Sequence, residues 1–270
     1  MPIIETNHIH IAYNTFGNPD APPLFLVHGL TANRTSMFPL AKRLSTHFHV
    51  FAYDCRGHGH SSKPAHYTLN DHAQDLLALI RAAGYRQAAV FGLSMGSYIA
   101  ACAAASSGGA IDRLVLVVTK PNDDGSGSSV ARLLKAEGLD LGSASEEETL
   151  TVIQQALWSP STPPARRDEI IAAKNECSRR WRMPILSTAQ RTAVNEALRG
   201  FDLRPLLPRI TCPTLVIAAR HDGLNPPEAG QAVAALIPHS RFEIFEHSGH
   251  MIEAEETDKL AQTTLSFLLC

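Results

Sequence analysis

A serine set between two glycines, in Gly92-Leu93-Ser94-Met95-Gly96, is the strongest chemical signal in this sequence. The apolar run 88–91 before it has strand character, and residues 97–105 after it indicate a helix. In that context the G-x-S-x-G pattern predicts a nucleophile elbow, a sharp turn that strains the serine backbone and exposes its hydroxyl. The glycines leave room for the strand and the helix to approach closely. The alternative is a Ser/Gly turn that only begins a buried helix.

A serine hydroxyl is a weak nucleophile, so Ser94 needs a base, and the base needs an acid. Histidine takes and returns a proton near neutral pH because its usual pKa is about 6.5. A carboxylate fixes the tautomer of that histidine. Asp222 follows the predicted strand 213–219, and His250 follows the predicted strand 242–245. Both should therefore lie at the carboxyl end of a parallel sheet, where the ligand sites of α/β proteins form.

Other residues could take the two supporting roles. His247 precedes His250 by three residues and is an alternative base. Asp123 and Asp124 come after a predicted strand, 114–118, and are alternative acids. The residues alone leave these alternatives open.

The segment 53–61 gathers further polar side chains. Asp54, His58 and His60 could bind a metal ion, but a loop that ties the sheet edge together explains the same residues. We expect the loop, with Asp54 and Arg56 supporting it.

Strand and helix patterns alternate in the first and last parts of the chain. The predicted strands are 9–13, 24–27, 50–53, 88–91, 114–118, 213–219 and 242–245, and the predicted helices are 36–46, 70–83, 97–105, 226–237 and 254–268. Repeated strand–helix units predict an α/β fold with a mostly parallel central sheet and helices on both faces.

The pattern changes in the middle of the chain. A Gly/Ser stretch at 125–129 is followed by helical segments at 130–135, from Ser145, and at 166–180, with no convincing strand before about Leu198. We expect a core of residues 1–119 and 203–270, and an inserted helical cap of residues 120–202.

Composition excludes several classes of protein. The 270 residues are 44% hydrophobic and carry a formal net charge of −2, so nothing points to a nucleic-acid partner. No apolar run approaches the ~18 residues of a membrane-spanning helix, and the first residues lack the features of a signal peptide. The five cysteines are scattered without a C-x-x-C pair, which indicates reduced thiols rather than zinc or disulfides. We expect a cytoplasmic protein with no membrane partner.

Taken together, these motifs resemble the α/β-hydrolase superfamily, in its small, single-cap, cofactor-free form. His28-Gly29 matches the oxyanion-loop motif of that family, and residues 53–61 match its D-x-R-G-x-G-x-S segment. The nearest groups are the carboxylesterase/non-haem perhydrolase group and the enol-lactonases. The resemblance covers residues 24–119 and 205–270 and leaves the cap unassigned.

The resemblance implies a role for each matching residue. Ser94 would be the nucleophile, Asp222 the acid and His250 the base, and the backbone N–H groups of Leu30 and Met95 would form the oxyanion hole. No metal ion and no organic cofactor are implied. Serine at the elbow argues against haloalkane dehalogenases and epoxide hydrolases, whose elbow carries aspartate.

The implied reaction is hydrolysis of a small carboxylic ester or lactone by water, through an acyl-enzyme and a Ser-His-Asp triad. Two alternatives stay open. One is a carbon–carbon bond hydrolase or enol-lactonase of aromatic catabolism, and the other is a ligand receptor or signalling partner that keeps the triad and turns over slowly.

Some residues of the cap and of the core have less certain roles. Trp158, Trp181 and Met183 are candidates to line the substrate pocket, although they could equally pack inside the cap. The arginines around Trp181 would favour an acidic substrate if one reached the pocket, and otherwise form a solvated face; they are Arg179, Arg180 and Arg182. His28 is expected to be structural, and Ser97 is small enough for the packing behind the elbow.

Overall fold

The computed structural model describes residues 2–123, 129–140 and 142–270. Within these residues eight strands form one sheet in the order β1-β2-β4-β3-β5-β6-β7-β8. The strands are β1 (Ile3–Thr6), β2 (Ile9–Phe16), β3 (Pro23–Val27), β4 (His49–Tyr53), β5 (Ala88–Leu93), β6 (Ile111–Val117), β7 (Thr214–Ala219) and β8 (Ser240–Phe245). The pairs β1–β2 and β2–β4 are antiparallel and the other pairs are parallel, which confirms the predicted mostly parallel sheet.

Burial on both faces explains the sequences of the central strands. β5 and β7 are buried along their whole length, and their residues are almost all apolar. Alternate side chains point to opposite faces, so Leu24 packs into one apolar core and Phe25 into the other. The sequence does not predict β1, because its four residues alternate between exposed and half-buried and form no apolar pattern.

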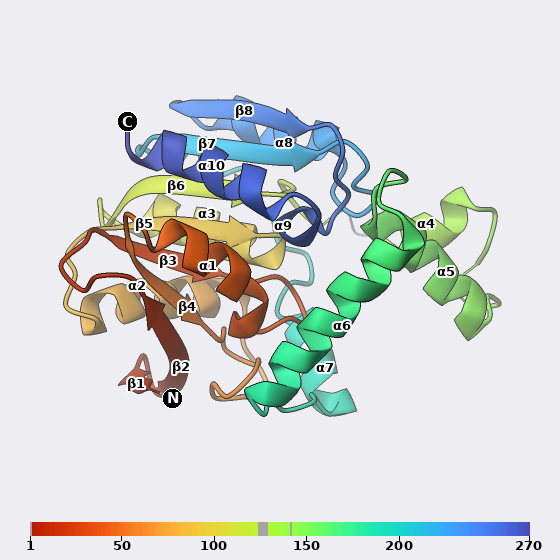
Figure 1. The fold of residues 1–270 in the computed structure, drawn as a ribbon, viewed down its shortest axis with the longest axis horizontal. Coiled ribbons are helices and arrows are strands. Elements are labelled where there is room, and N and C mark those ends of the chain that lie inside the picture. Colours follow the sequence, from red (N-terminus) through yellow and green to blue (C-terminus); the bar gives the residue numbers. More distant parts are fainter. Residues whose placement is uncertain (1, 124–128, 141) are drawn as a thin grey trace.

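Helices cover both faces of the sheet (Figure 1). One face carries α1 (Phe38–Leu44), α9 (Ile252–Glu255) and α10 (Thr257–Leu268), and the other carries α2 (Leu69–Ala82), α3 (Met95–Ser106) and α8 (Pro227–Leu236). Two predicted helices are divided. The region 36–46 starts as a 3-10 turn, Arg34–Met37, and the region 254–268 is interrupted at Glu256, whose φ of −127° and ψ of 46° are not helical.

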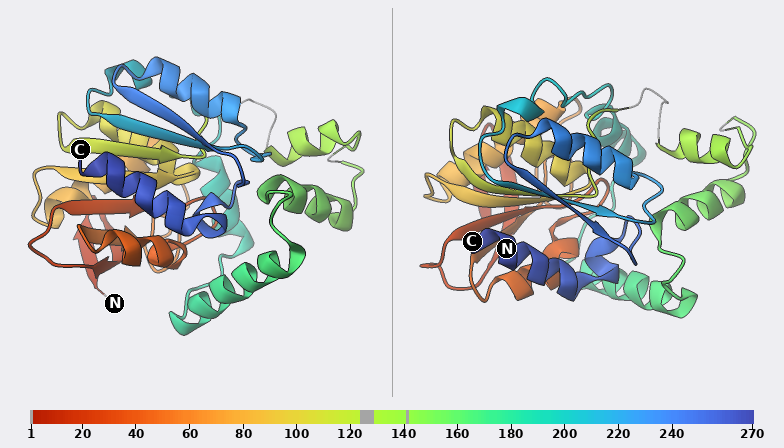
Figure 2. Two further views of the ribbon diagram at one scale, coloured as in Figure 1. Left: turned by 45° about the horizontal axis from the view of Figure 1, so that its top comes forward. Right: turned by 90° about the horizontal axis from the view of Figure 1, so that it is seen from above.

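Four further helices lie between β6 and β7 in the sequence. They are α4 (Ser129–Ala136), α5 (Glu146–Leu157), α6 (Pro164–Arg180) and α7 (Thr188–Glu196). Figures 1 and 2 place them beyond the carboxyl ends of the parallel strands. Ser145 caps α5 as predicted, in a capping box with Glu148. The division at residues 119 and 203 stays a prediction, although a bridge between Asn122 and Asp202 joins the two ends of this segment.

Two further predictions concern membranes and cysteines. In the ranges that the structure describes, no helix is both long and apolar enough to cross a bilayer. All five cysteines are free, with Cys55 and Cys102 buried and Cys270 exposed.

Candidate active site

Ser94 occupies the turn between β5 and α3. Its φ of 52° and ψ of −119° are strained for a residue with a side chain. The turn depends on two glycines, because a Cβ on Gly92 would overlap the Gly96 carbonyl and a Cβ on Gly96 would overlap the Val27 carbonyl. This backbone geometry places the Ser94 side chain at the amino end of α3.

Three turns at the carboxyl end of the sheet bring Ser94, His250 and Asp222 together. Ser94 Oγ lies 3.0 Å from His250 Nε2, and His250 Nδ1 lies 2.8 Å from Asp222 Oδ2. Asp222 follows β7, and its other oxygen, Oδ1, accepts hydrogen bonds from the N–H groups of Leu224 at 2.8 Å and Asn225 at 2.9 Å. The carboxylate is therefore buried with both oxygens hydrogen-bonded.

These contacts fix where the protons lie. A carboxylate accepts hydrogen bonds and cannot donate, so His250 Nδ1 carries the proton that Asp222 receives. In the neutral ring Nε2 is then an acceptor, and the Ser94 hydroxyl donates to it. The tautomer is the one that a general base beside a serine requires.

The charges around His250 shift its pKa. Burial lowers the pKa of this imidazole, the Asp222 carboxylate raises it, and the net pKa lies above the ordinary 6.5. Glu253 raises this pKa further and Lys174 lowers it. His250 is therefore a stronger base than a solvent-exposed histidine.

The loop after β3 passes close to Ser94. A Cβ on Gly29 would lie 3.6 Å from Ser94 Cβ, so the next residue, Leu30, borders the same space. Among the described residues, the backbone N–H groups of Leu30 and Met95 donate to no protein acceptor. Two unused donors near a serine are the elements of an oxyanion hole.

His28 holds this loop in place. Its Nε2 accepts a hydrogen bond from the Cys55 N–H at 3.0 Å, and its Nδ1 donates to the Gly29 carbonyl at 2.8 Å. Burial lowers the pKa of His28, which keeps the ring neutral so that Nε2 can accept. The contacts match the expected structural role.

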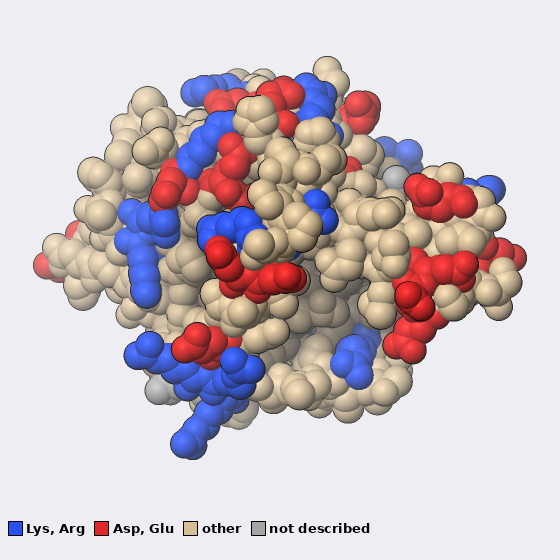
Figure 3. Space-filling view, turned by 45° about the vertical axis from the view of Figure 1, so that its right-hand side comes forward, with Lys and Arg blue, Asp and Glu red and all other residues tan. Residues whose placement is uncertain are grey.

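A cavity of about 730 Å³ opens above Ser94 and His250. Its walls come from the Gly29 loop, the elbow, the turn after β7, and the helices α5, α6 and α7. Figure 3 shows the surface hollowed, with acidic side chains close to the hollow. A space of this size holds a small organic molecule.

The sequence model of the alpha/beta hydrolase family matches residues 24–263. The chain belongs to the alpha/beta hydrolase family. Ser94, Asp222 and His250 all fall within the matched region of this hydrolase, as do the oxyanion-hole candidates.

Curated relatives and solved structures agree with the family. The hydrolase is 29% identical to pimeloyl-acyl-carrier protein methyl ester esterase of Vibrio vulnificus strain CMCP6 over 251 residues, which are 91% of this chain and 94% of the relative. It is 27% identical to 3-oxoadipate enol-lactonase 2 of Acinetobacter baylyi over 263 residues, 94% of this chain and 91% of the relative. The crystal structure of the enol-lactonase from Burkholderia xenovorans LB400 superposes with a TM-score of 0.83 at 27% identity, covering 100% of both chains.

The described alternatives, His247 and Asp123, make hydrogen bonds with residues other than Ser94 and His250. His247 is exposed, and its carbonyl accepts a hydrogen bond from Ser161 Oγ at 3.2 Å. Asp123 borders the cavity, but its carboxylate accepts the Gly200 N–H at 2.9 Å. Asp124 lies outside the described residues. Of the described candidates, His250 and Asp222 are the pair hydrogen-bonded in line with Ser94.

Hydrogen bonds and a buried ion pair hold the polar segment 53–61 in place. The Asp54 carboxylate receives the His60 N–H at 2.8 Å and pairs with the buried Arg34 guanidinium. His58 Nδ1 donates to the Arg56 carbonyl at 2.9 Å. In the part of the chain that is described, no group of three or more His, Cys, Asp or Glu residues is placed to hold a metal ion.

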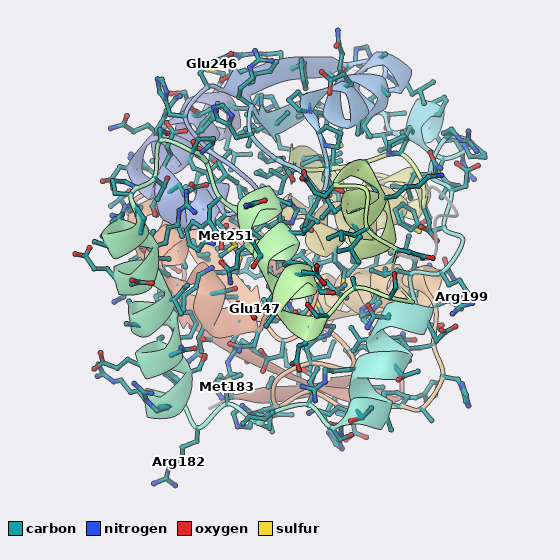
Figure 4. All side chains as sticks on the ribbon, turned by 90° about the vertical axis from the view of Figure 1, so that its right-hand side faces the viewer. Glu147, Arg182, Met183, Arg199, Glu246 and Met251 are labelled. Carbon is teal, nitrogen blue, oxygen red and sulfur yellow. The ribbon has the colours of Figure 1, made fainter. Side chains whose placement is uncertain are left out.

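The predicted pocket residues do not line this cavity. Trp158 is buried and its Nε1 donates to Gln154 Oε1 at 3.0 Å, while Trp181 packs edge-on against Phe38 at 5.3 Å. Met183 lies at the far end of α6 from Met251, which does border the cavity (Figure 4). The tryptophans and Met183 therefore pack where the helical segment meets the core, which corrects the prediction from residue type.

The arginines near Trp181 also lie away from the cavity. Arg179, Arg180 and Arg182 are exposed, and Arg182 points outward in Figure 4. Their positions agree with the second of the two alternatives from the sequence, a solvated face. They give no evidence for an acidic substrate.

Sequence patterns do not reveal three residues at the site. Tyr98 and Asn225 line the cavity beside Ser94, and Lys174 of α6 reaches Glu253 at 2.6 Å. Tyr98 sits four residues after Ser94, so helical spacing places it on the same side of α3 and is the one signal that could have found it.

Proposed function

We propose that this alpha/beta hydrolase is a serine hydrolase that cleaves a small carboxylic ester or lactone through an acyl-enzyme. Ser94 is the nucleophile, His250 the base and Asp222 the acid. The observation that carries the proposal is the hydrogen-bonded row of these three residues beneath a cavity of about 730 Å³. The relatives named as an esterase and as enol-lactonases support esters and lactones as the bonds cleaved.

In acylation, Ser94 Oγ attacks the carbonyl carbon of the substrate while its proton passes to His250 Nε2. The carbonyl electron pair moves onto oxygen, where the N–H groups of Leu30 and Met95 stabilise the charge. Each such donor contributes on the order of 2.7–4 kcal/mol in comparable enzymes. The bond to the alcohol oxygen then breaks, and that oxygen takes the proton from Nε2.

In deacylation, water takes the place of Ser94 and attacks the acyl-enzyme by the same steps. His250 Nε2 takes a proton from water as the water oxygen bonds to the acyl carbon. The bond to Ser94 Oγ breaks, and Oγ takes the proton back from Nε2. An ester yields an acid and an alcohol, and a lactone yields a hydroxy acid. No step requires a metal ion or an organic cofactor.

The test is hydrolysis of p-nitrophenyl esters from acetate to decanoate, together with a simple γ-lactone. We expect turnover of at least one class by the wild type and none above background by Ser94→Ala with an unchanged unfolding temperature. The chain length with the highest kcat/KM reports how deep the cavity is. A folded wild type that turns over neither class, or a Ser94→Ala variant that stays active, contradicts the proposal.

The two supporting roles have matched controls within the chain. Asp222→Asn should lower kcat by about 10³–10⁴-fold, because an amide no longer holds the required tautomer. Asp123→Asn changes the other candidate acid and should lower kcat far less. His250→Gln and His247→Gln make the same comparison for the base. If both variants of a pair lose the same fraction of kcat, the proposed role of Asp222 as the acid, or of His250 as the base, is contradicted.

A further inference from the structure

The turns that carry the acid and the base both contact the same end of α5. Gly223 directly follows the acid and donates its N–H to the Ala156 carbonyl at 3.0 Å. Met251 directly follows the base and donates its N–H to the Leu157 carbonyl at 3.1 Å. These carbonyls belong to the last two residues of α5, where a helix leaves its carbonyl groups without a partner of its own. One helix end therefore holds both turns side by side.

Two glycines allow the turns to approach α5 this closely. A Cβ on Gly223 would lie 2.7 Å from the Cβ of Ala156, and a Cβ on Gly249 would lie 2.6 Å from the Leu157 carbonyl oxygen. Both distances are shorter than a real Cβ atom tolerates, so a larger residue would push either turn away from the helix. The glycine beside the base is therefore required by its contact with the segment between β6 and β7.

The carboxylate of Glu255, in α9, joins the turn of the base to the chain that follows α5. Its Oε2 accepts the Gly249 N–H at 2.7 Å. Its Oε1 accepts the Ser159 N–H at 2.9 Å and the Thr162 hydroxyl at 2.6 Å. Because Gly249 immediately precedes His250, this side chain fixes the backbone next to the base.

We propose that Glu255 is a positioning residue: together with the carboxyl end of α5, it holds the base and the acid in line with Ser94. The proposal rests on the proposed acyl-enzyme mechanism. In that mechanism a proton crosses the 3.0 Å between Ser94 Oγ and His250 Nε2, and a displacement of about 1 Å can lower the rate about 10²-fold. The chain between β6 and β7 is then part of the framework that aligns the triad, besides covering the cavity.

A glutamine cannot make the contacts that this carboxylate makes. A carboxylate accepts hydrogen bonds on both oxygens, whereas the amide of Glu255→Gln has one acceptor oxygen and an NH₂ group that only donates. The N–H groups of Gly249 and Ser159 point to different oxygens of the carboxylate. In either orientation of the amide, one of these N–H groups would face the NH₂ group and lose its partner. The turn of the base and the chain after α5 would then separate.

The test compares Glu255→Gln with the wild type on p-nitrophenyl esters from acetate to decanoate. We expect kcat to fall about 10- to 100-fold at every chain length with KM within about twofold, because a displaced base affects all substrates alike. The downfield proton NMR signal of the His250 Nδ1 proton, identified by its loss in His250→Gln, should shift or disappear, because its hydrogen bond to Asp222 depends on the same alignment. Glu255→Asp keeps the charge but is too short to reach both sides, so it should show the same changes and is measured in case Glu255→Gln does not fold.

Glu246→Gln is the matched control, since Glu246 also follows β8 but pairs with the exposed Arg220 at 2.8 Å. It should keep the wild-type kcat, KM and NMR signal. The proposal is overturned if Glu255→Gln keeps the wild-type kcat and NMR signal, even with a lower unfolding temperature, or if its KM changes with chain length, which would make Glu255 part of the pocket wall. A wild type without ester turnover would instead overturn the hydrolase mechanism, and the NMR comparison would still test the alignment.

Discussion

His250 is surrounded by three charges that act on its basicity in opposite directions. Asp222 touches its Nδ1, and Glu253 lies three residues further along the chain. Lys174 of α6 lies 2.6 Å from Glu253 Oε1, so one helix of the segment between β6 and β7 places a charge near His250. Both carboxylates raise the pKa of His250, and Lys174 lowers it.

The pH profile of the free enzyme follows from these charges. A general base works when neutral, so kcat/KM should rise with pH through an apparent pKa above 6.5. Lys174→Met removes a charge that lowers this pKa and should move the rising limb to higher pH. Glu253→Gln should move it to lower pH. Profiles of p-nitrophenyl acetate hydrolysis between about pH 5 and pH 9 measure both shifts, and shifts in the same direction would show that the charges do not act through His250.

At the scale of single elements, local sequence predicts where Ser94, Asp222 and His250 lie better than it predicts which residues line the cavity. Ser94 and Asp222 follow the apolar strands β5 and β7, and His250 follows β8, in which apolar and polar residues are mixed, so the strand order places all three at one sheet edge. The pocket wall depends on how α5 packs: Leu157 borders the cavity, but Trp158 next to it is buried elsewhere. The residue pattern of one helix does not predict which of these two neighbours faces the cavity.

Backbone conformation sets a second limit on what the sequence predicts. The strand expected at 114–118 ends at Val117, because Val118 has a φ of 47°, which is rare for a β-branched residue. Two long-range hydrogen bonds hold it there, from its N–H to the Ile217 carbonyl at 2.8 Å and from Asn225 Nδ2 to its own carbonyl at 2.6 Å. Contacts so distant in sequence leave no local signal.

The elbow is the element whose packing can be tested most directly. Gly96→Ala would place a methyl group on the Val27 carbonyl, in a region without free space. We expect a loss of about 1–3 kcal/mol in the free energy of unfolding, measured by urea denaturation, together with a large loss of kcat. Gly142→Ala is the control, because nothing lies within 4 Å of the added Cβ. If the two variants are equally stable, the elbow is less tightly packed than the contacts indicate.

At the scale of the whole molecule, three histidines form a buried group under the active site. His28, His58 and His72 are buried, and the ring centroids are 5.0 Å apart for His28–His58 and 6.4 Å apart for His58–His72. Burial lowers the pKa of all three, that of His58 to about 3. Protonating one of them would place a charge in the core beside the other two rings.

This group should make the whole fold sensitive to mild acid. The pKa values of these histidines in the folded protein lie below the value of about 6.5 in the unfolded chain. Above pH 6.5 the rings are neutral in both states, so they do not lower the free energy of unfolding there. As the pH falls below 6.5, the unfolded chain binds protons that the native state does not bind, so the free energy of unfolding decreases. Each histidine contributes at most about 1.4 kcal/mol per pH unit to this decrease. The free energy of unfolding, measured in urea at several pH values from about 7.5 to 5, should therefore decrease as the pH falls.

One substitution can remove the contribution of a single histidine to the pH dependence of the free energy of unfolding. His58→Asn keeps a side-chain N–H for the Arg56 carbonyl, which His58 Nδ1 contacts at 2.9 Å, but it cannot titrate. The variant should lose some stability at pH 7.5 and show a slope smaller by at most about 1.4 kcal/mol per pH unit. His66→Asn removes an exposed histidine and should leave the slope as in the wild type. Because the acid-induced loss of stability would come from the core beside the loop after β3, activity should disappear at the same pH as the folded structure. A slope that His58→Asn does not reduce would place the acid sensitivity in other groups.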